Sequence, residues 1–280
     1  MHVARGLSQL NQHLNSFSSK NKSIGFVPTM GALHQGHLHL VSQAVKQNEI
    51  SICSIYVNPT QFNDPKDFEK YPRNDAQDIE LLKSTGLDIV YFPEYKELYP
   101  DGKPELIDYT DKDLFGSFEG EFRPGHFQGV VTVVMRLFEH TKPSKAYFGL
   151  KDYQQYLVIK RATEFFEKKI DVIGISTVRN EQGLALSSRN KRLSALDLEK
   201  SLVISKALHS IKNAWDFEDL EEIVQKAKLM INAAGLELEY LTVCNKNDLI
   251  AVDNWLSKGE HVAVCAAFMG QVRLIDNLIF

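Results

Sequence analysis

Segments with the pattern of buried strands alternate with helix-like segments along the N-terminal part of this 280-residue chain. Strands are predicted at residues 23–27, 50–57, 87–92, 145–148 and 170–178. Helices are predicted at residues 37–46, 75–83, 130–140 and 153–167. The first strand is predicted to end at Pro28, which has no N–H to donate to a sheet. Alternation of this kind predicts an α/β fold, in which helices cover both faces of a parallel sheet.

The pattern changes after residue 187, where two helix-like segments are followed by strand-like segments without alternation. The helices are predicted at residues 190–213 and 218–234, and the strands at 238–243, 261–268 and 272–277. Such an order is typical of a small α+β domain with an antiparallel sheet. We therefore predict two domains, residues 1–178 and residues 179–280.

Residues 24–41 carry the most specific chemical signal of the chain: a short apolar strand, a glycine-containing turn and the start of a helix. Gly31 and Gly36 have no Cβ atom, so a ligand could come close to the backbone. His34 and His37 are three residues apart, which predicts both rings on one side of the helix. A helix N-terminus after a strand favours a bound phosphate, but the Gly-Lys-Ser/Thr ending of a Walker loop is absent. The segment predicts a nucleotide site of another kind.

Other interpretations of these histidines are a pair of surface residues, as we expect for His39, and a zinc site. No nearby cysteine or pair of carboxylates completes a zinc ligand set, so no metal site is predicted. A serine nucleophile is not supported either, because the chain has no Gly-x-Ser-x-Gly elbow.

Asn58 and Gln61 follow the second predicted strand, in the segment Tyr-Val-Asn-Pro-Thr-Gln-Phe. They are candidates for binding a substrate where the sheet opens. The alternative is a plain turn, since Asn-Pro is a common turn signal.

Lys151 and Asp152 follow the strand predicted at 145–148. Lys151 is a candidate phosphate ligand, and Asp152 could accept hydrogen bonds from a ribose. Alternatively, Asp152 and Gln155 form a capping box at the start of the next helix. Both roles are compatible, because nucleotides bind where a helix starts beside the end of a strand.

Two further clusters are rich in polar side chains. Ser187, Ser188 and Arg189 combine short donors with a forked cation and suit phosphate oxygens, although a serine N-cap followed by a surface arginine is the simpler interpretation. Arg123 and His126 are predicted in a turn before the apolar helix at 130–140, either as part of a mobile lid or as a surface loop.

The composition limits the class of protein. The net charge is −4, with 32 basic and 36 acidic residues and no long basic run, which argues against a nucleic-acid partner. Three cysteines, Cys53, Cys244 and Cys265, are too few and too far apart for a disulfide framework, so we expect them to be buried thiols. No apolar run is long enough to cross a membrane, and the N-terminus lacks a signal-peptide core. We therefore expect a cytoplasmic protein.

Together, these motifs resemble the pantothenate synthetase family, also called pantoate–beta-alanine ligases. The resemblance rests on Pro28-Thr-Met-Gly-Ala-Leu-His-Gln-Gly-His37, Val57-Asn-Pro-Thr-Gln-Phe62, Arg123-Pro-Gly-His-Phe127, Tyr147-Phe-Gly-Leu-Lys-Asp-Tyr-Gln-Gln155, Ser187-Ser-Arg-Asn190 and Arg273-Leu-Ile-Asp-Asn277. It covers nearly the whole chain. Leu150, Gln182 and Leu186 depart from the usual glutamate, aspartate and methionine.

The resemblance implies a Rossmann-like ATP- and pantoate-binding domain, a C-terminal lid domain and a homodimer. It implies catalytic roles for His37, His34, Lys151 and Arg189. The ATP-binding residues that it implies are Met30, Gly31, Ala32, Leu33, His34, Gln35, Gly36, His37, Gly149, Leu150, Lys151, Asp152, Val178, Leu186, Ser187, Ser188 and Arg189. Residues implied for pantoate or beta-alanine are Gln61, Gln155, Asn58 and Arg123.

The reaction implied is the ATP-dependent ligation of pantoate and beta-alanine to pantothenate through a pantoyl adenylate, with release of pyrophosphate and AMP. Mg²⁺ is expected to be carried on the ATP phosphates. The alternatives are another His-x-Gly-His adenylyltransferase, acting on a phosphorylated cofactor precursor, and a non-catalytic adenine-nucleotide-binding or RNA-binding protein. A requirement for beta-alanine separates the ligase from the first, and turnover separates it from the second.

Overall fold

The structure is a computed structural model that describes residues 1–17, 22–63, 65–215 and 217–280. Contacts within the chain divide it into two units. Unit 1 comprises Met1–Leu150 and Gln155–Ser176, and unit 2 comprises Lys151–Gln154 and Thr177–Phe280. The short segment Lys151–Gln154 therefore groups with the C-terminal residues although it follows a strand of unit 1.

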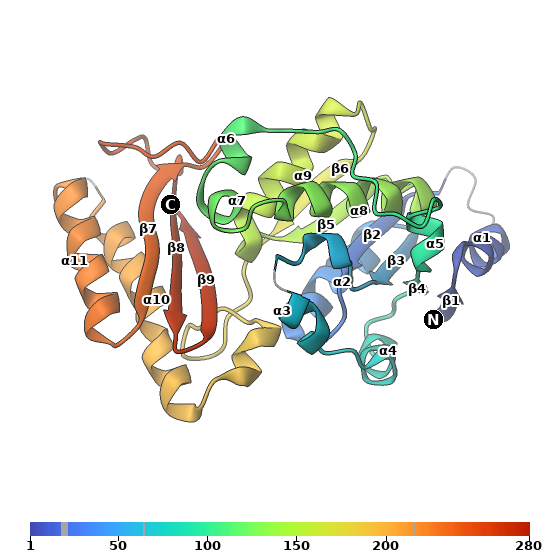
Figure 1. The fold of residues 1–280 in the computed structure, drawn as a ribbon, viewed down its shortest axis with the longest axis horizontal. Helices are drawn as coiled ribbons and strands as arrows, with labels where there is room; N and C mark the ends of the chain where they lie inside the picture. Colours follow the sequence, from blue (N-terminus) through green and yellow to red (C-terminus); the bar gives the residue numbers. More distant parts are fainter. Residues whose placement is uncertain (18–21, 64, 216) are drawn as a thin grey trace. The chain divides into compact units, whose positions relative to one another are not determined.

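Six parallel strands form the sheet of unit 1, in the order β1-β4-β3-β2-β5-β6 (Figure 1). They are β1 His2–Arg5, β2 Ile24–Thr29, β3 Ile50–Ile55, β4 Ile89–Phe92, β5 Lys145–Gly149 and β6 Asp171–Ile175. The predicted parallel sheet is confirmed. The strand β1 was not predicted, because four residues are too short to give a clear alternation.

All four helices predicted in this part of the chain are present; three have bounds within two residues of the prediction, and the one predicted at 130–140 begins four residues earlier. The helices of this part of the chain are α1 Leu7–Ser16, α2 Gln35–Gln47, α3 Pro65–Lys70, α4 Asp75–Lys83, α5 Tyr95–Leu98, α6 Lys112–Phe115, α7 Phe118–Phe122, α8 His126–Thr141 and α9 Tyr153–Phe165, with the 3-10 turns η1 Pro59–Gln61 and η2 Leu150–Asp152. The prediction missed α1 and the short helices α3, α5, α6 and α7.

Helices cover both faces of the sheet. Val27 lies in an apolar cluster with Val41 and Ala44 of α2. Its neighbour Phe26 meets Phe138 of α8 edge-on, with ring centroids 6.1 Å apart. Because adjacent strand residues point to opposite faces, α2 and α8 lie on opposite sides of β2. The predicted layer arrangement is confirmed.

The prediction that the first strand ends at Pro28 is wrong, since β2 continues to Thr29 and Pro28 pairs in register with Ser54. The carbonyl of Thr29 accepts the N–H of Tyr56 beyond β3, so the peptide groups of odd-numbered residues face β3. Those of even-numbered residues, including Pro28, face β5. β2 pairs with β5 at Gly25 and Phe26 and not at Pro28, so the missing N–H of Pro28 removes no hydrogen bond between the two strands.

Unit 2 contains an antiparallel sheet in the order β7-β8-β9, formed by β7 Glu237–Asn245, β8 His261–Met269 and β9 Val272–Ile279. The helices are α10 Ala195–Asn213 and α11 Leu220–Ala233, preceded by the 3-10 turn η3 Ser188–Arg192. The helix predicted from residue 190 starts later, because the Ser194 side chain accepts the N–H of Asp197 and caps α10.

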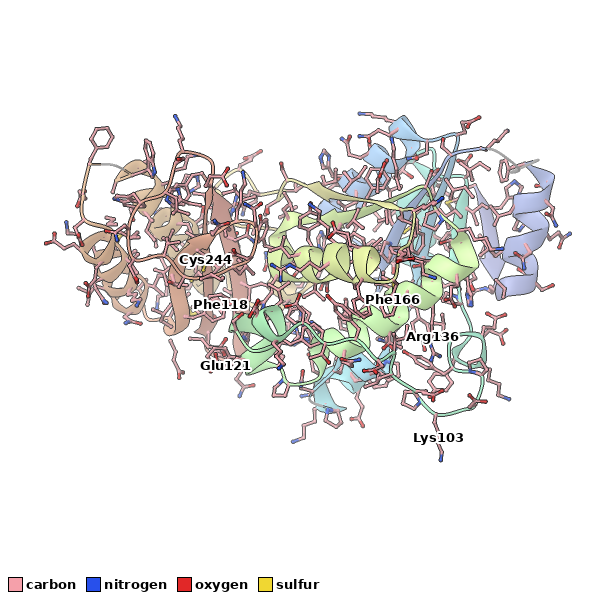
Figure 2. The ribbon with its side chains drawn as sticks, turned by 90° about the horizontal axis from the view of Figure 1, so that it is seen from above. Lys103, Phe118, Glu121, Arg136, Phe166 and Cys244 are labelled. Atoms are coloured by element: carbon pink, nitrogen blue, oxygen red, sulfur yellow. The ribbon has the colours of Figure 1, made fainter. Side chains whose placement is uncertain are left out.

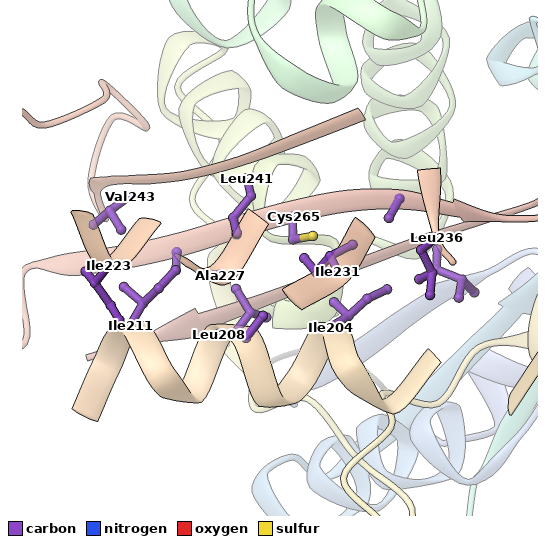
Figure 3. Packing of buried hydrophobic residues seen from close by; sticks show 14 of the residues in the cluster. Ile204, Leu208, Ile211, Ile223, Ala227, Ile231, Leu236, Leu241, Val243 and Cys265 are labelled. Carbon is purple, nitrogen blue, oxygen red and sulfur yellow. The ribbon is translucent and has the colours of Figure 1, made fainter. Parts of the chain in front are cut away.

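The core of unit 2 is apolar. Ile204, Leu208 and Ile211 of α10 interdigitate with residues of α11 and with the inner face of the sheet (Figure 3). The sheet side contributes Leu241 and Cys265. This packing gives the predicted small α+β fold its own hydrophobic cluster.

All three cysteines are buried and free, as predicted. Burial raises the pKa of the Cys53 thiol to about 12 and that of Cys244, labelled in Figure 2, to about 12 as well. Neutral buried thiols of this kind act as small apolar side chains. Among the described residues, no helix combines the length and apolar character needed to cross a membrane.

Candidate active site

The predicted site residues of unit 1 follow three adjacent strands at their carboxyl ends. The turn with His34 and His37 follows β2, the 3-10 turn with Gln61 follows β3, and Gly149 ends β5. Since β2 lies between β3 and β5, these segments emerge at one edge of the sheet. The strand that follows β2 in the sequence, β3, pairs on one side of it, and the later strand β5 pairs on the other side. The strand order therefore reverses at β2, and α/β sheets bind ligands at such a switch point.

His34 lies in the turn before the helix and is the N-cap of α2, with extended backbone. Its Nδ1 accepts the N–H of Gly36 at 3.1 Å, and Nδ1 of His37 accepts the N–H of His34 at 3.3 Å. The two ring centroids are 4.1 Å apart. With Nδ1 accepting, a neutral ring carries its proton on Nε2, so each ring has a donor on the side away from the cap. His39 is exposed, as predicted.

Asp78, a buried residue of α4 that the sequence analysis did not single out, supports this turn. Its carboxylate accepts the N–H of Ala32 at 2.9 Å and that of Leu33 at 2.8 Å. Ala32 has a φ of 50° and Gly31 a φ of 78°, both in the left-handed region. A Cβ atom at Gly31 would lie 2.9 Å from Oδ2 of Asp78. Packing within the protein therefore requires this glycine, apart from any ligand.

Gln61 and Asn58 are both buried and are held in one network, as their positions after β3 suggested. The Nε2 of Gln61 contacts Sδ of Met30 at 3.0 Å, which joins the η1 turn to the end of β2. Nδ2 of Asn58 donates to Oε1 of Gln61 at 3.3 Å and to the carbonyl of Gly129 at 3.1 Å. Tyr99 donates its hydroxyl to Oδ1 of Asn58 at 2.7 Å.

Tyr99 was missed by the sequence analysis because it lies in a short segment with no motif. Burial raises its pKa, against the opposing influence of Thr60, Arg136 and Asn58, so the hydroxyl stays protonated and remains a donor. The guanidinium of Arg136, labelled in Figure 2, lies 4.7 Å from the ring centroid. Asn58 is thus a buried amide with defined partners on both ends and not a simple turn residue.

The main chain of Gln61 is held from α8. Nδ1 of His126 lies 2.8 Å from the Gln61 carbonyl, and Nη2 of Arg123 lies 3.5 Å from it. His126 is the first residue of α8 and is buried, so its prediction in a turn and as part of a surface loop is wrong. Gly125 caps this helix with a φ of 79°, which lets α8 begin earlier than the apolar run suggests.

Seven of the predicted residues lie in unit 2: Lys151, Asp152, Val178, Leu186, Ser187, Ser188 and Arg189. Lys151 and Asp152 form a 3.6 Å ion pair, and the Lys151 side chain is 19% exposed. Val178 and Leu186 are joined by a main-chain hydrogen bond of 3.0 Å. Ser187 accepts the N–H of Arg189 and caps the 3-10 turn η3, whereas the α-helix that follows, α10, is capped by Ser194. The Ser187 hydroxyl and the Arg189 cation therefore belong to the same short turn.

Gln155 belongs to the first turn of α9, in unit 1 with Gln61. Within the described ranges, no group of three or more histidine, cysteine, aspartate or glutamate side chains is placed to hold a metal ion. Within unit 1, the histidine turn and the buried amides offer neutral donors, and within unit 2 the serine–arginine turn offers hydroxyls and a cation. Each of these is a kind of group that binds phosphate or carboxylate oxygens.

A family model described as pantoate-beta-alanine ligase matches residues 2–279. The chain belongs to the pantoate–beta-alanine ligase family. It is 41% identical over 279 residues to a pantothenate synthetase of Bacteroides fragilis strain YCH46, covering 99% of this chain and 98% of that protein. It is also 41% identical over 284 residues to a pantothenate synthetase of Francisella philomiragia, covering 100% and 97%.

Solved structures of the family agree. The pantothenate synthetase of Thermus thermophilus superposes with a TM-score of 0.92 at 37% identity, covering 99% of both chains. The pantoate–beta-alanine ligase of Francisella tularensis, solved in complex with beta-gamma ATP and beta-alanine, gives a TM-score of 0.81 at 39% identity, covering 100% of this chain and 97% of that chain. The predicted family, its fold and the enzyme class are confirmed: an ATP-dependent ligase that forms pantothenate from pantoate and beta-alanine.

Proposed function

We propose that this chain performs the family reaction with the residues assembled above. A carboxylate is a poor electrophile, so pantoate first attacks the α-phosphate of ATP and forms pantoyl adenylate with loss of pyrophosphate. The amine of beta-alanine then attacks the acyl carbon and releases AMP. The protein is required mainly to position the reactants and to stabilise the charge that builds on the leaving pyrophosphate. The network that fixes Gln61 supports this proposal most, because a buried amide pair suits a substrate with hydroxyls and a carboxylate.

In unit 1, we assign the ATP phosphates to the turn of residues 30–37. His37 and His34 would donate from Nε2 to phosphate oxygens, with His37 as the proton donor. Gln61 and Gln155 would bind pantoate, with Asn58 and Arg123 around Gln61. The Nδ1 contacts of both histidines support this assignment, because they fix the ring orientation.

In unit 2, we assign Lys151, Ser187, Ser188 and Arg189 to phosphate oxygens and Asp152 to the ribose hydroxyls. Val178 and Leu186 would line the ATP site. Mg²⁺ is proposed to be carried on the phosphates, where it would neutralise part of their charge. In functional terms, we propose residues 1–178 as the ATP- and pantoate-binding domain and residues 179–280 as the lid domain.

ATP–pyrophosphate exchange, run with and without pantoate, tests the proposal. We expect exchange only when pantoate is present, and AMP with pantothenate only after beta-alanine is added. Exchange that ignores pantoate would refute the substrate. ATP binding without any turnover would instead favour a non-catalytic nucleotide-binding protein.

We also propose that the protein is a cytoplasmic homodimer. The edge strand β6 supports the dimer, since it pairs with β5 and leaves its residues 172–175 half-buried within one chain. The free edge of such a strand offers main-chain groups with which a second copy of the chain can pair. Light scattering should give about twice the 31.8 kDa chain mass, and Val172→Lys should reduce it. Cell fractionation tests the location.

A further inference from the structure

Lys151 is held by the C-terminal strand of unit 2. The side chain of Asn277, in β9, donates from Nδ2 to the carbonyl of Lys151 at 2.8 Å. The hydroxyl of Tyr153 donates to the carbonyl of Lys246 at 2.8 Å. These two hydrogen bonds connect the Lys151–Gln154 segment to residues about a hundred positions further along the chain, which is why the segment groups with unit 2.

The main chain of Asn277 is fixed at both of its polar groups. Its N–H donates to Oδ1 of Asp276 at 2.8 Å, and its main-chain carbonyl accepts a hydrogen bond from Nη2 of Arg179 at 3.1 Å. Arg179 also forms a two-point ion pair with Asp276, with contacts of 2.5 and 2.9 Å. Asn277 and Asp276 are only 6% and 5% exposed. A buried two-point ion pair of this kind holds its partners in one geometry.

We propose that Asn277 is a positioning residue for ATP: it fixes the main chain of Lys151 and thereby the origin of the lysine side chain. This inference rests on the proposed role of Lys151 at the phosphates. It assigns a task to the last two residues of the Arg-Leu-Ile-Asp-Asn segment, which otherwise have none in the reaction. A lysine on a flexible stem binds phosphate as a point charge, so its backbone anchor decides where that charge is held.

A double-mutant cycle tests the proposal, using kcat/KM for ATP in pantoate-dependent exchange and the melting temperature of each variant. Asn277→Ala should lower kcat/KM for ATP about 10-fold, as expected when one hydrogen bond is lost. Asn277→Asp should not restore activity, because a carboxylate cannot donate to the Lys151 carbonyl. In the Lys151→Ala background, Asn277→Ala should change kcat/KM less than about 2-fold, while the melting temperature falls as in the wild-type background.

Asn48→Ala is the matched control. Asn48 likewise donates from Nδ2 to a main-chain carbonyl, that of Ala44 at 2.8 Å, but it lies at the C-terminal end of α2. The Asn48→Ala variant should have a lower melting temperature and an unchanged kcat/KM for ATP. Equal effects of Asn277→Ala in both backgrounds, or a loss of stability without a change in kcat/KM, would overturn the positioning role. Wild-type exchange that does not need pantoate would instead contradict the proposed function, so the two failures are distinguishable.

Discussion

Asp78 binds the main chain of Ala32: its Oδ2 accepts the Ala32 N–H at 2.9 Å, below the turn that presents the two histidines. Its other oxygen accepts the next N–H, of Leu33, at 2.8 Å. A single buried carboxylate therefore holds two consecutive peptide groups, one of them in a left-handed conformation that an alanine rarely adopts. The turn that carries the two histidines is therefore stabilised by a residue of α4, about 45 positions further along the chain.

Replacing Asp78 should affect both stability and adenylate formation. Asp78→Asn keeps the shape but leaves one N–H without an acceptor, so we expect the free energy of unfolding to fall by about 1–3 kcal/mol. Exchange activity should fall with it, because the histidine turn relaxes. Asp75→Asn is the control, since Asp75 lies on the same helix and forms an exposed ion pair with Arg5. Urea unfolding that shows the same small change for both variants would contradict this role.

His37→Ala should lower the rate of pantoate-dependent exchange by about 100-fold or more, the range for a lost donor at a developing charge. The melting temperature should fall by only a few degrees, because the helix-cap hydrogen bond that the ring accepts from the His34 N–H contributes about 1 kcal/mol. His39→Ala is the matched control, as His39 is exposed on the same helix. Parallel loss of stability and activity in His37→Ala would favour a purely structural role.

Tyr99→Phe should raise the KM for pantoate about 5- to 10-fold, because the change removes the hydroxyl that holds Oδ1 of Asn58 and loosens Gln61. The KM for ATP should stay nearly constant. Tyr95→Phe provides the control, since that neighbouring ring lies 5.0 Å away at the surface. If both Michaelis constants rise together, the network does not act through pantoate.

Gly129→Ala should destabilise the protein, although alanine is normally more favourable than glycine within a helix. A Cβ at this position in α8 would lie 2.4 Å from the carbonyl oxygen of Thr60, so η1 must move. Because Gln61 belongs to η1, its displacement should also raise the KM for pantoate. A variant that is more stable than the wild type would show that η1 can shift without cost.

Stability should fall in mildly acidic solution because of His261. This residue is fully buried in β8, and burial lowers its pKa, with the Phe280 and Glu260 interactions opposing. The unfolded chain takes up the proton near the ordinary pKa of about 6.5, before the folded chain does. The free energy of unfolding therefore decreases as the pH falls below that value, until the lower folded pKa is passed.

His261→Gln should reduce this slope, by at most about 1.4 kcal/mol per pH unit, the value for one proton. Urea unfolding of both proteins between pH 7.5 and 5 measures it. The other titrating groups are present in both proteins, so the difference in slope reports His261 alone. Identical slopes would mean that His261 is protonated equally in the folded and unfolded chains.

The sequence alone determined the alternation of strands and helices, the separate C-terminal pattern and the family motifs. These signals are local: apolar periodicity and short polar segments after strands depend on neighbouring residues, so they can be read along the chain. Gln61, Lys151 and the histidine pair were found in this way. The start of α8 at His126 was missed because it depends on the conformation of Gly125, which caps the helix. The continuation of β2 through Pro28 was missed because it depends on Pro28 facing β5 at a position where the two strands do not pair.

Only the tertiary structure revealed Asp78 beneath Ala32, Tyr99 beside Asn58, and Asn277 against Lys151. Each of these contacts joins residues that are 41 to 126 positions apart. A buried carboxylate, hydroxyl or amide has no periodicity of its own, and its role is set by which distant backbone group it satisfies. The motifs therefore name the groups that we propose to act on the substrates, while the fold selects the residues that hold those groups in place.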